Sequence, residues 1–361
     1  MKKILILNNY SITKVRKEIA EGLKPSNHLY GVIELENAGY ELIILDPIKK
    51  GFWFSFGNIL AKLPLCNIGD LNIQIRALLI YKKYDIVYGL SQDVTILLGF
   101  LSYLTLFRKP IIAIGHHPFL NGKLKRLRLF SLYFSLRGHK FFPALSSVVA
   151  NQINLIACKN ISNYIPWGPD IKYYDNQLRK HFNNDHTEKN FDFVCIGRTG
   201  RDFITFVHAV SQTQFSALVY CPIIYKEYFQ KLGIKNVSLH FLYEEEPLTY
   251  PDIIQLYSMC KVIAIPTNST NSLVGLTSIA DATALGMPIL ITINSFLELD
   301  VEKESIGYLV NINDVNDWKL KMNQIIEHNL QDMQIKSREY AHSFANHKIF
   351  SNLLLKFIQQ C

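Results

Sequence analysis

Charged residues are scarce in this chain of 361 residues: Asp, Glu, Lys and Arg together make up 19%, below the roughly 25% of an average soluble protein. Acids are scarcer than bases, with 30 Asp+Glu against 38 Lys+Arg, so the formal net charge is +8. The chain does not lack apolar residues, at 49%, which excludes a disordered protein or a disulfide-stapled miniature fold. Its length predicts about two domains, and its excess positive charge indicates an anionic partner.

Cysteine motifs and long apolar runs are also missing. The six cysteines form no CxxC pair and show no zinc-like spacing with histidine, so we interpret them as reduced, structural thiols of a cytoplasmic protein. The longest apolar run, Val94–Phe107, is too short to span a bilayer. The apolar run after Met1 ends at Asn8, which is too short for a signal peptide and predicts a first strand. We therefore expect no membrane-spanning segment.

Short apolar segments alternate with amphipathic ones, a pattern typical of βαβ units and parallel sheets. The expected strands form two series: Lys3–Leu7, Glu41–Leu45, Ile86–Tyr88 and Pro110–Ile114, then Phe191–Ile196, Ala217–Tyr220, Val262–Ile265 and Pro288–Thr292. This predicts an α/β protein with two Rossmann-like domains. The expected division is a first domain at 1–170, a polar linker at 171–190, a second domain at 191–330 and C-terminal helices at 331–361.

A glycine-bearing turn follows the expected strand Phe191–Ile196. It contains Gly197, Arg198 and Arg201 and leads into an apolar-periodic helix. Such a turn lets backbone N–H groups approach a phosphate, and arginines add bidentate donors suited to a diphosphate. The alternative is an ordinary strand-to-helix turn with solvated arginines.

A second segment begins at Gly275 with a predicted helix that Thr277 or Ser278 caps and that Gly286 ends. Asp281 would project from the same end, where its carboxylate could accept hydrogen bonds from two adjacent hydroxyls, such as those of a ribose. The alternative is a capped core helix with one exposed acid.

Together with Ile165–Tyr174, these two segments occur in the order typical of one large family. The chain resembles the GT-B-fold nucleotide-sugar glycosyltransferases, especially the large retaining family, glycosyl transferases group 1. The resemblance covers roughly residues 165–330. It implies two Rossmann-like domains facing a cleft, a donor bound mainly to the C-terminal domain, and final helices that pack back on the N-terminal domain.

The resemblance also assigns roles on the donor side. Arg198 and Arg201 would contact the diphosphate, and Asp281 would bind the ribose. Leu273 stands where the family carries the first of two glutamates. This departure leaves open the donor sugar, and whether the enzyme retains or inverts configuration. The segment from Gly275 to Ser278 suggests a phosphate cradle instead, with Thr277 and Ser278 supplying amides and hydroxyls.

Two candidates lie in the first half. His116 follows the strand Pro110–Ile114, where the family places a histidine directed at the donor sugar; the alternative is a pair of surface histidines, His116 and His117. Asp93 follows the strand Ile86–Tyr88, at the edge where α/β sites lie. Asp93 could be the general base of an inverting enzyme, although a helix N-cap is the favoured role.

From Val94 to Pro169 there is no Asp or Glu, but there are nine Lys and Arg. Within this stretch, Lys123, Lys125, Arg126 and Arg128 begin a helix whose remainder is apolar and aromatic. This composition is typical of a helix lying on an anionic membrane surface. The alternative is a buried Rossmann helix with a solvated basic end. Nucleic-acid binding is disfavoured, since no recognition motif accompanies the charge.

The sequence thus predicts a glycosyltransferase that moves a sugar from a nucleoside diphosphate sugar, with a UDP-sugar favoured and no metal, to a glycan or lipid-linked acceptor of cell-surface polysaccharide synthesis. The expected location is cytoplasmic, peripheral on the inner face of the cell membrane. Two alternatives remain: a GT-B sugar-nucleotide epimerase, and a non-catalytic membrane-surface partner of a glycan-assembly complex.

Overall fold

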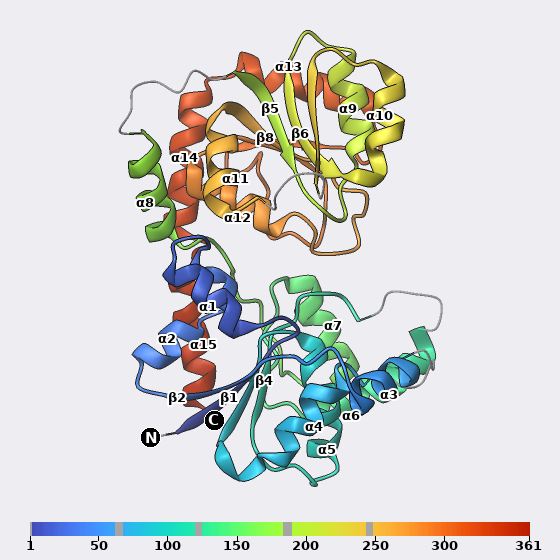
Figure 1. The fold of residues 1–361 in the computed structure, drawn as a ribbon, viewed down its shortest axis with the longest axis vertical. Helices are drawn as coiled ribbons and strands as arrows, with labels where there is room; N and C mark the ends of the chain where they lie inside the picture. The colour runs from blue at the N-terminus through green and yellow to red at the C-terminus, as the bar shows by residue number, and fades with distance from the viewer. Residues whose placement is uncertain (1, 62–67, 120–124, 183–189, 243–247) are drawn as a thin grey trace. The chain divides into compact units, whose positions relative to one another are not determined.

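The computed structural model describes residues 2–61, 68–119, 125–182, 190–242 and 248–361, with the backbone alone for 125–128 and 181–182. The chain divides into two compact units (Figure 1). Unit 1 comprises Met1–Glu21, Ser26–Trp167 and His347–Cys361. Unit 2 comprises Gly22–Pro25 and Gly168–Asn346. Each unit is built around its own parallel sheet.

Unit 1 has a parallel sheet in the order β2-β1-β3-β4. Its strands are β1 (Lys3–Leu7), β2 (Glu41–Leu45), β3 (Ile86–Gly89) and β4 (Ile111–Ala113). Its helices are α1 (Ile12–Ala20), α2 (Val32–Asn37), α3 (Phe52–Leu60), α4 (Leu71–Leu79), α5 (Ile96–Tyr103), α6 (Lys125–Arg137), α7 (Ser147–Ala157) and α15 (His347–Gln359). Short 3₁₀ turns lie at Ser26–Leu29, Tyr81–Lys83 and Gln92–Val94.

The central strand β1 explains why this sheet is buried on both faces. Its run Ile4-Leu5-Ile6-Leu7 is fully buried, as expected of a parallel strand that helices cover on both sides. Helices α4 and α5 pack on one face through Ile73 and Leu98, among others, while α1, α2 and α15 lie toward the other (Figure 1).

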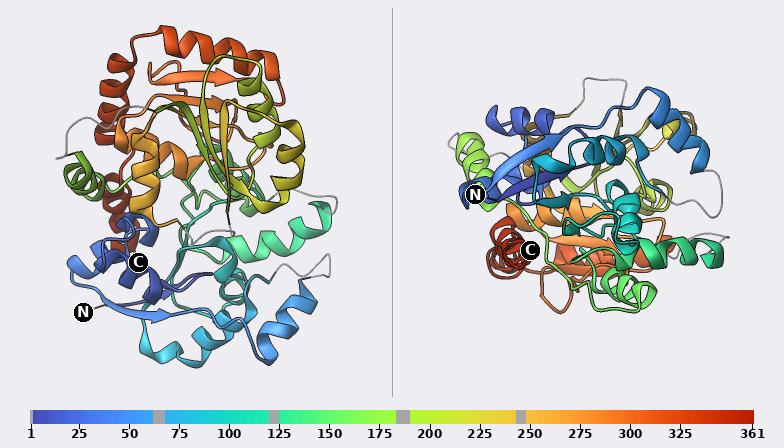
Figure 2. Two further views of the ribbon diagram at one scale, coloured as in Figure 1. Left: turned by 45° about the horizontal axis from the view of Figure 1, so that its top comes forward. Right: turned by 90° about the horizontal axis from the view of Figure 1, so that it is seen from below.

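Unit 2 has a six-stranded parallel sheet in the order β10-β9-β8-β5-β6-β7. Its strands are β5 (Phe191–Ile196), β6 (Ala217–Pro222), β7 (Val237–Leu242), β8 (Cys260–Ile265), β9 (Ile289–Thr292) and β10 (Gly307–Val310). Its helices are α8 (Ile171–Phe182), α9 (Phe203–Ser211), α10 (Lys226–Leu232), α11 (Tyr250–Ser258), α12 (Leu276–Leu285), α13 (Val315–Glu327) and α14 (Leu330–Ser343), with a 3₁₀ turn at Ile223–Tyr225. Helices cover both faces of the sheet (Figure 2). The two faces pack against separate clusters of buried apolar residues.

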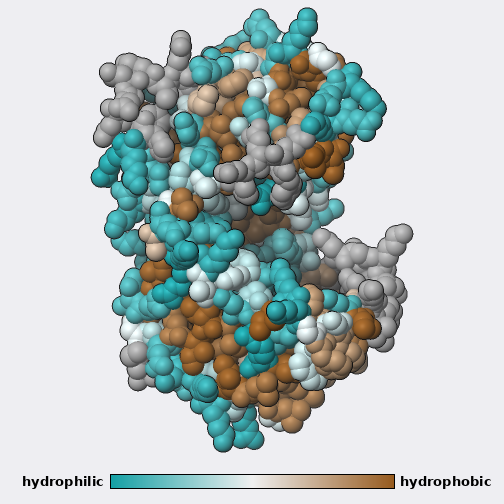
Figure 3. Space-filling model, in the orientation of Figure 1, coloured by the Kyte–Doolittle hydropathy of each residue, from teal (hydrophilic) through white to brown (hydrophobic). Residues whose placement is uncertain are grey.

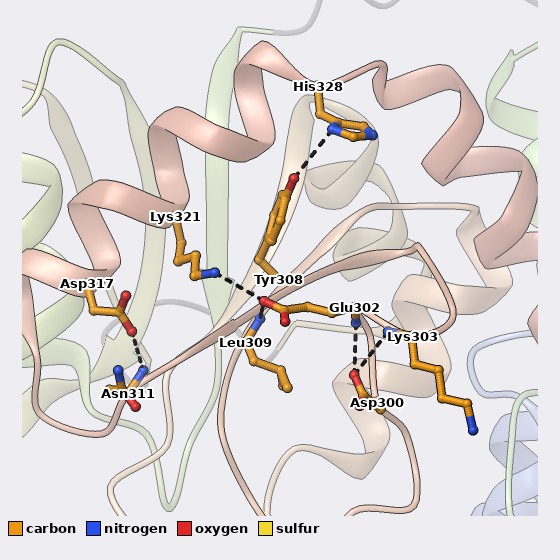
Figure 4. A network of polar contacts seen from close by, with 9 residues as sticks. All are labelled: Asp300, Glu302, Lys303, Tyr308, Leu309, Asn311, Asp317, Lys321 and His328. Atoms are coloured by element: carbon orange, nitrogen blue, oxygen red, sulfur yellow. Dashed lines mark hydrogen bonds and ion pairs between the residues drawn. The ribbon is translucent and has the colours of Figure 1, made fainter.

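Strand β10 is an edge strand, and its exposed side carries a polar network (Figure 4). Glu302 accepts a hydrogen bond from the backbone N–H of Leu309 at 3.1 Å and pairs with Lys321 at 3.2 Å. Asp317 accepts from the N–H of Asn311 at 2.7 Å. Because unpaired strand edges promote aggregation, this network has a structural role in closing the edge.

The eight expected strands are all present within two residues at each end. The structure adds β7 and β10, which the sequence reading did not count as strands. The polar segment predicted as a linker is largely the helix α8, because Tyr174 and Gln177 lie on one face of it and are buried. The C-terminal helices divide: α14 belongs to unit 2 and α15 to unit 1, so the boundary lies at residue 346 and not at 330.

Candidate functional site

The residues predicted for the donor side meet where the strand order of unit 2 reverses. From β5 the chain proceeds outward to β6 and β7, then returns to β8 on the other side of β5. The loops after β5 and β8 therefore diverge, which leaves a crevice at the carboxyl edge in this type of sheet. Arg201, after β5, forms an isolated antiparallel bridge with Thr267, after β8. The N–H of Asp202 donates to the carbonyl of Pro266 at 3.1 Å. The turn predicted at Gly197–Asp202 is thus fixed at this switch point.

Two glycines give this turn its shape. A Cβ atom on Gly197 would lie 2.7 Å from Cγ of Arg201. Gly200 has φ +69°, and a Cβ there would lie 2.7 Å from a methyl of Val274. Both glycines let the chain fold tightly beneath the Arg201 side chain.

Gly197→Ala tests that role. The added methyl would overlap Cγ of Arg201 and push its side chain aside. If the turn binds a nucleoside diphosphate, as the sequence predicts, the affinity for UDP should fall at least tenfold. Calorimetric titration with UDP measures this. Gly233→Ala is the control for a loss of stability alone, because its Cβ meets no atom within 4 Å while its φ of +59° strains an alanine. Unchanged UDP affinity in Gly197→Ala would contradict the role of Gly197 in positioning the Arg201 side chain.

Arg201 is a buried cation, with only 6% of its surface exposed. Its Nη2 donates a hydrogen bond to Oγ of Ser278 at 2.9 Å. Burial lowers the pKa of its guanidinium, and the nearby Asp281 opposes that shift. The sequence-level alternative of solvated arginines is therefore wrong for Arg201. Arg198, on the same turn, is exposed.

Ser278 lies in the first turn of α12, and this helix begins differently from the prediction. The N-cap is Gly275, at φ +102° and with no side-chain cap, so neither Thr277 nor Ser278 caps the helix. The first intrahelical bond runs from Ile279 to Gly275, and the N–H groups before Ile279 therefore have no partner within the helix. Thr277 is exposed. The helix ends at Gly286, with φ +65°, as predicted.

Asp281 lies one turn further into α12 and is buried, with 7% of its surface exposed. The alternative of one exposed acid is therefore wrong. Its Oδ1 accepts a hydrogen bond from the hydroxyl of Tyr174 on α8. Burial raises the pKa of Asp281 to about 7, against the opposing effects of Tyr174 and Arg201. The sequence analysis did not assign a role to Tyr174, although this residue ends the segment Ile165–Tyr174 that carries part of the family resemblance.

The first-half candidates lie at the carboxyl edge of the unit 1 sheet. His116 follows β4, and its backbone N–H donates to Oε1 of Gln92 at 3.0 Å. Its Nε2 lies 2.7 Å from the carbonyl oxygen of Leu90, so Nε2 carries the proton and Nδ1 is the acceptor. Tyr30 packs edge-on against the ring. Burial lowers the pKa of His116 to about 4, so its imidazole is neutral at pH 7.

Asp93 lies in the 3₁₀ turn Gln92–Val94, between β3 and α5. Helix α5 begins at Ile96 with Thr95 as its N-cap residue, so the favoured N-cap role of Asp93 is wrong. Its carboxylate accepts a hydrogen bond from the Ser91 hydroxyl, and its charge acts on both His116 and His117. Gln92, which sequence reasoning did not single out, orients this loop through the backbone N–H groups of both histidines.

The basic segment is described in part. Lys123 lies outside the described residues, and Lys125, Arg126 and Arg128 belong to α6 with their backbone alone described. Later in α6, Leu132 and Leu136 are buried while Phe130 is 67% exposed. Within the ranges that the structure describes, no cluster of three His, Cys, Asp or Glu could hold a metal ion, and no helix is long and apolar enough to cross a membrane.

Comparisons with known proteins give structural matches alone. No protein-family model matches the chain, and no curated protein sequence matches it. Sucrose-phosphate synthase from Thermosynechococcus elongatus is 13% identical with a TM-score of 0.71, over 100% of this chain and 99% of that chain. HepE from Anabaena, crystallised with UDP-glucose, is 14% identical with a TM-score of 0.65, over 100% of both chains.

A third match is the UDP-GlcNAc 2-epimerase from Neisseria meningitidis bound to UDP-GlcNAc, 12% identical with a TM-score of 0.58 over 100% of both chains. At such identities the likeness shows the fold. The chain has the two-domain GT-B fold, which confirms the fold predicted from the sequence. Since transferases and an epimerase share this fold, the chemistry has to be argued from the site.

Proposed function

We propose that this protein is a glycosyltransferase whose unit 2 binds a nucleoside diphosphate sugar. The observation that carries the proposal is the buried Arg201 bonded to Ser278 in the first turn of α12. A helix N-terminus already bears partial positive charge, so a cation beside it is unfavourable without an anion. Among the described residues, Arg201 has an electrostatic partner in Asp281 but no ion pair with it. A bound diphosphate supplies the missing negative charge.

The same groups suit the chemistry of sugar transfer. When the bond between the sugar and the diphosphate breaks, negative charge grows on the departing diphosphate. Arg201, Arg198 and the N–H groups of Thr277 and Ser278 would stabilise that charge, and such preorganised electrostatics often contribute the largest share of catalysis. We propose that arginine side chains and backbone N–H groups, and not a metal ion, offset the negative charge of the diphosphate. Asp281, held by Tyr174, would accept hydrogen bonds from the ribose hydroxyls.

Unit 1 would supply the groups for the sugar and its acceptor. The Nδ1 atom of neutral His116 can accept a hydrogen bond from a sugar hydroxyl, because Nε2 is committed to Leu90. Asp93 lies near both histidines and would be the general base if the reaction inverts. The acceptor we propose is a glycan or lipid-linked intermediate of cell-surface polysaccharide synthesis. The protein would then act in the cytoplasm, peripherally on the inner face of the cell membrane, where the basic start of α6 would face anionic lipid.

A panel of nucleotides tests the donor side. Thermal unfolding is measured with UDP, GDP, dTDP and CMP at millimolar concentration. A ligand that binds the folded state alone, at 100 times its Kd, stabilises by about 2.7 kcal/mol, which corresponds to several degrees in this size range. We expect the largest shift with UDP. No shift with any of the four would refute the nucleotide site.

The fate of the nucleotide sugar distinguishes the proposed transferase from the alternative, an epimerase. A transferase consumes the nucleotide sugar only when an acceptor is present, apart from slow hydrolysis, and releases the nucleoside diphosphate. An epimerase inverts a sugar carbon without any acceptor. NMR of UDP-GlcNAc incubated with the protein alone distinguishes the two outcomes, and a new epimer signal would favour the epimerase.

A further inference from the structure

Helix α3 presents aromatic side chains to solvent in a way that the proposed donor and acceptor groups do not use. Phe52, Phe56 and Ile59 are 71%, 39% and 60% exposed, and they lie at i, i+4 and i+7, on one face of the helix. Trp53, 42% exposed, flanks this stripe and contacts Phe52 edge-on. The Phe52 and Phe56 rings stack with centroids 5.8 Å apart. We call these four residues the α3 face.

A glycine attaches α3 to unit 1. Gly57 is the one buried residue of the helix, and a Cβ there would lie 2.9 Å from Cβ of Leu71 on α4. The stripe of Phe52, Phe56 and Ile59 lies on the opposite side and is thereby turned outward, with Trp53 at its border. Helix α3 lies at the margin of unit 1 in both views of Figure 2. Figure 3 shows apolar side chains gathered over this part of unit 1. The α3 face is thus an exposed apolar surface rather than part of a core.

The charged residues that directly precede α3 in the sequence have one sign. Lys49 and Lys50 are exposed immediately before the helix, and no Asp or Glu occurs from Pro47 to Gly69. An apolar, aromatic face bordered by lysine is the composition of helices that lie in the interface of an anionic bilayer. Tryptophan is enriched at that depth because its ring is apolar and its N–H is polar.

The size of the α3 face argues against a second copy of the chain as its occupant. From the exposed fractions of the four side chains, it offers on the order of 400 Å². A stable interface between proteins buries about 800 Å² on each partner. A bilayer needs no matching partner surface, because the acyl chains close around whatever is inserted.

We propose that α3 is the element that inserts into an anionic phospholipid membrane, with Phe52, Trp53, Phe56 and Ile59 in the interface and Lys49 and Lys50 at the headgroups. This inference deepens the membrane part of the proposed function, on which it rests, and assigns the apolar contact to α3 and not to α6.

The three tryptophans provide a direct test. Trp167 and Trp318 are 4% and 1% exposed, so a change of emission on adding vesicles reports Trp53. With vesicles of 70% phosphatidylcholine and 30% phosphatidylglycerol, the full-length protein should show a blue shift. Trp53→Phe should bind equally well without the shift. A wild-type protein that floats with these vesicles but shows no blue shift would overturn the assignment to α3.

Partition into vesicles by flotation completes the test. The variant Phe52→Ser, Phe56→Ser, Ile59→Ser should bind at least tenfold more weakly. Lys49→Ser with Lys50→Ser should bind more weakly at low salt and lose part of the salt dependence of vesicle binding, because the basic start of α6 would still face the lipid. The control Leu79→Ser with Leu106→Ser changes two unit 1 side chains that are 80% and 72% exposed and should bind as wild type. Equal loss in the control, or a dimer that dissociates in the triple variant without vesicles, contradicts the proposal.

Flotation is measured without nucleotide, and UDP binding is measured separately without vesicles. Vesicle binding through α3 in a protein that fails to bind UDP would leave this inference standing and remove the proposed function. UDP binding without vesicle binding would leave the proposed donor site standing and remove this inference.

Discussion

Arg201→Met should abolish sugar transfer and weaken UDP binding by at least a hundredfold, while the fold remains as stable as that of the wild type. Methionine fills a similar volume without charge, so it removes the buried cation without leaving a large cavity. Removing one donor to a developing oxyanion costs about a hundredfold to a thousandfold in rate. Burying a charge is itself costly, so its removal should not lower the free energy of unfolding in the absence of ligand.

Two further variants sharpen this result. Arg201→Lys keeps the charge but loses the planar donor set, and it should recover UDP binding in part. Arg179→Ala, an exposed arginine on α8, should behave as wild type. Transfer activity is measured as release of UDP with acceptor present, and thermal unfolding confirms the fold. Wild-type UDP affinity in Arg201→Met would remove Arg201 from the diphosphate site.

Asp281→Asn should stabilise the protein at pH 8 and make its free energy of unfolding less dependent on pH. In the unfolded chain an Asp titrates near 3.8, whereas burial raises the pKa of Asp281 to about 7 in the folded protein. Between these values the folded state holds a proton that the unfolded state has lost. Stability from this group is therefore greatest below about pH 4, falls as pH rises toward 7, and is level above that.

The size of the effect follows from the shift. One pKa unit corresponds to 1.36 kcal/mol, so the loss for Asp281 is on the order of 4 kcal/mol between pH 4 and pH 8. Asparagine cannot ionise but can still accept the hydrogen bond from Tyr174. Urea titrations at several pH values measure the free energy of unfolding, with Glu227→Gln on the exposed surface as control. A parallel pH profile in wild type and Asp281→Asn would show that folding does not raise the pKa of Asp281.

The sequence predicted the strands well where a parallel strand is buried on both faces, because its apolar run is continuous, as in β1. Strand β7 was missed because Ser238 and His240 interrupt its apolar pattern. Helix α8 was taken for a linker because its exposed side is polar. The burial of its other side could not be predicted, because it depends on contacts such as that between Tyr174 and Asp281, which are 107 residues apart.

The residues predicted for the donor side could be grouped from the sequence, since the turns that follow parallel strands lie together at the carboxyl edge of the sheet. Their individual environments could not be predicted. Whether Arg201 is solvated or buried depends on contacts distant in sequence, such as the hydrogen bond that its guanidinium donates to Ser278 on α12. The N-cap assigned to Asp93 failed for a local reason: a 3₁₀ turn delays the start of α5 to Ile96.

The most direct test of the account is calorimetric titration of the wild-type protein with UDP, UMP and uridine. If Arg201 and the first turn of α12 hold a diphosphate, UDP binds at least tenfold more tightly than UMP, and uridine binds most weakly. Equal affinity for the three, or no binding of UDP at millimolar concentration, would contradict the diphosphate site and with it the proposed glycosyltransferase.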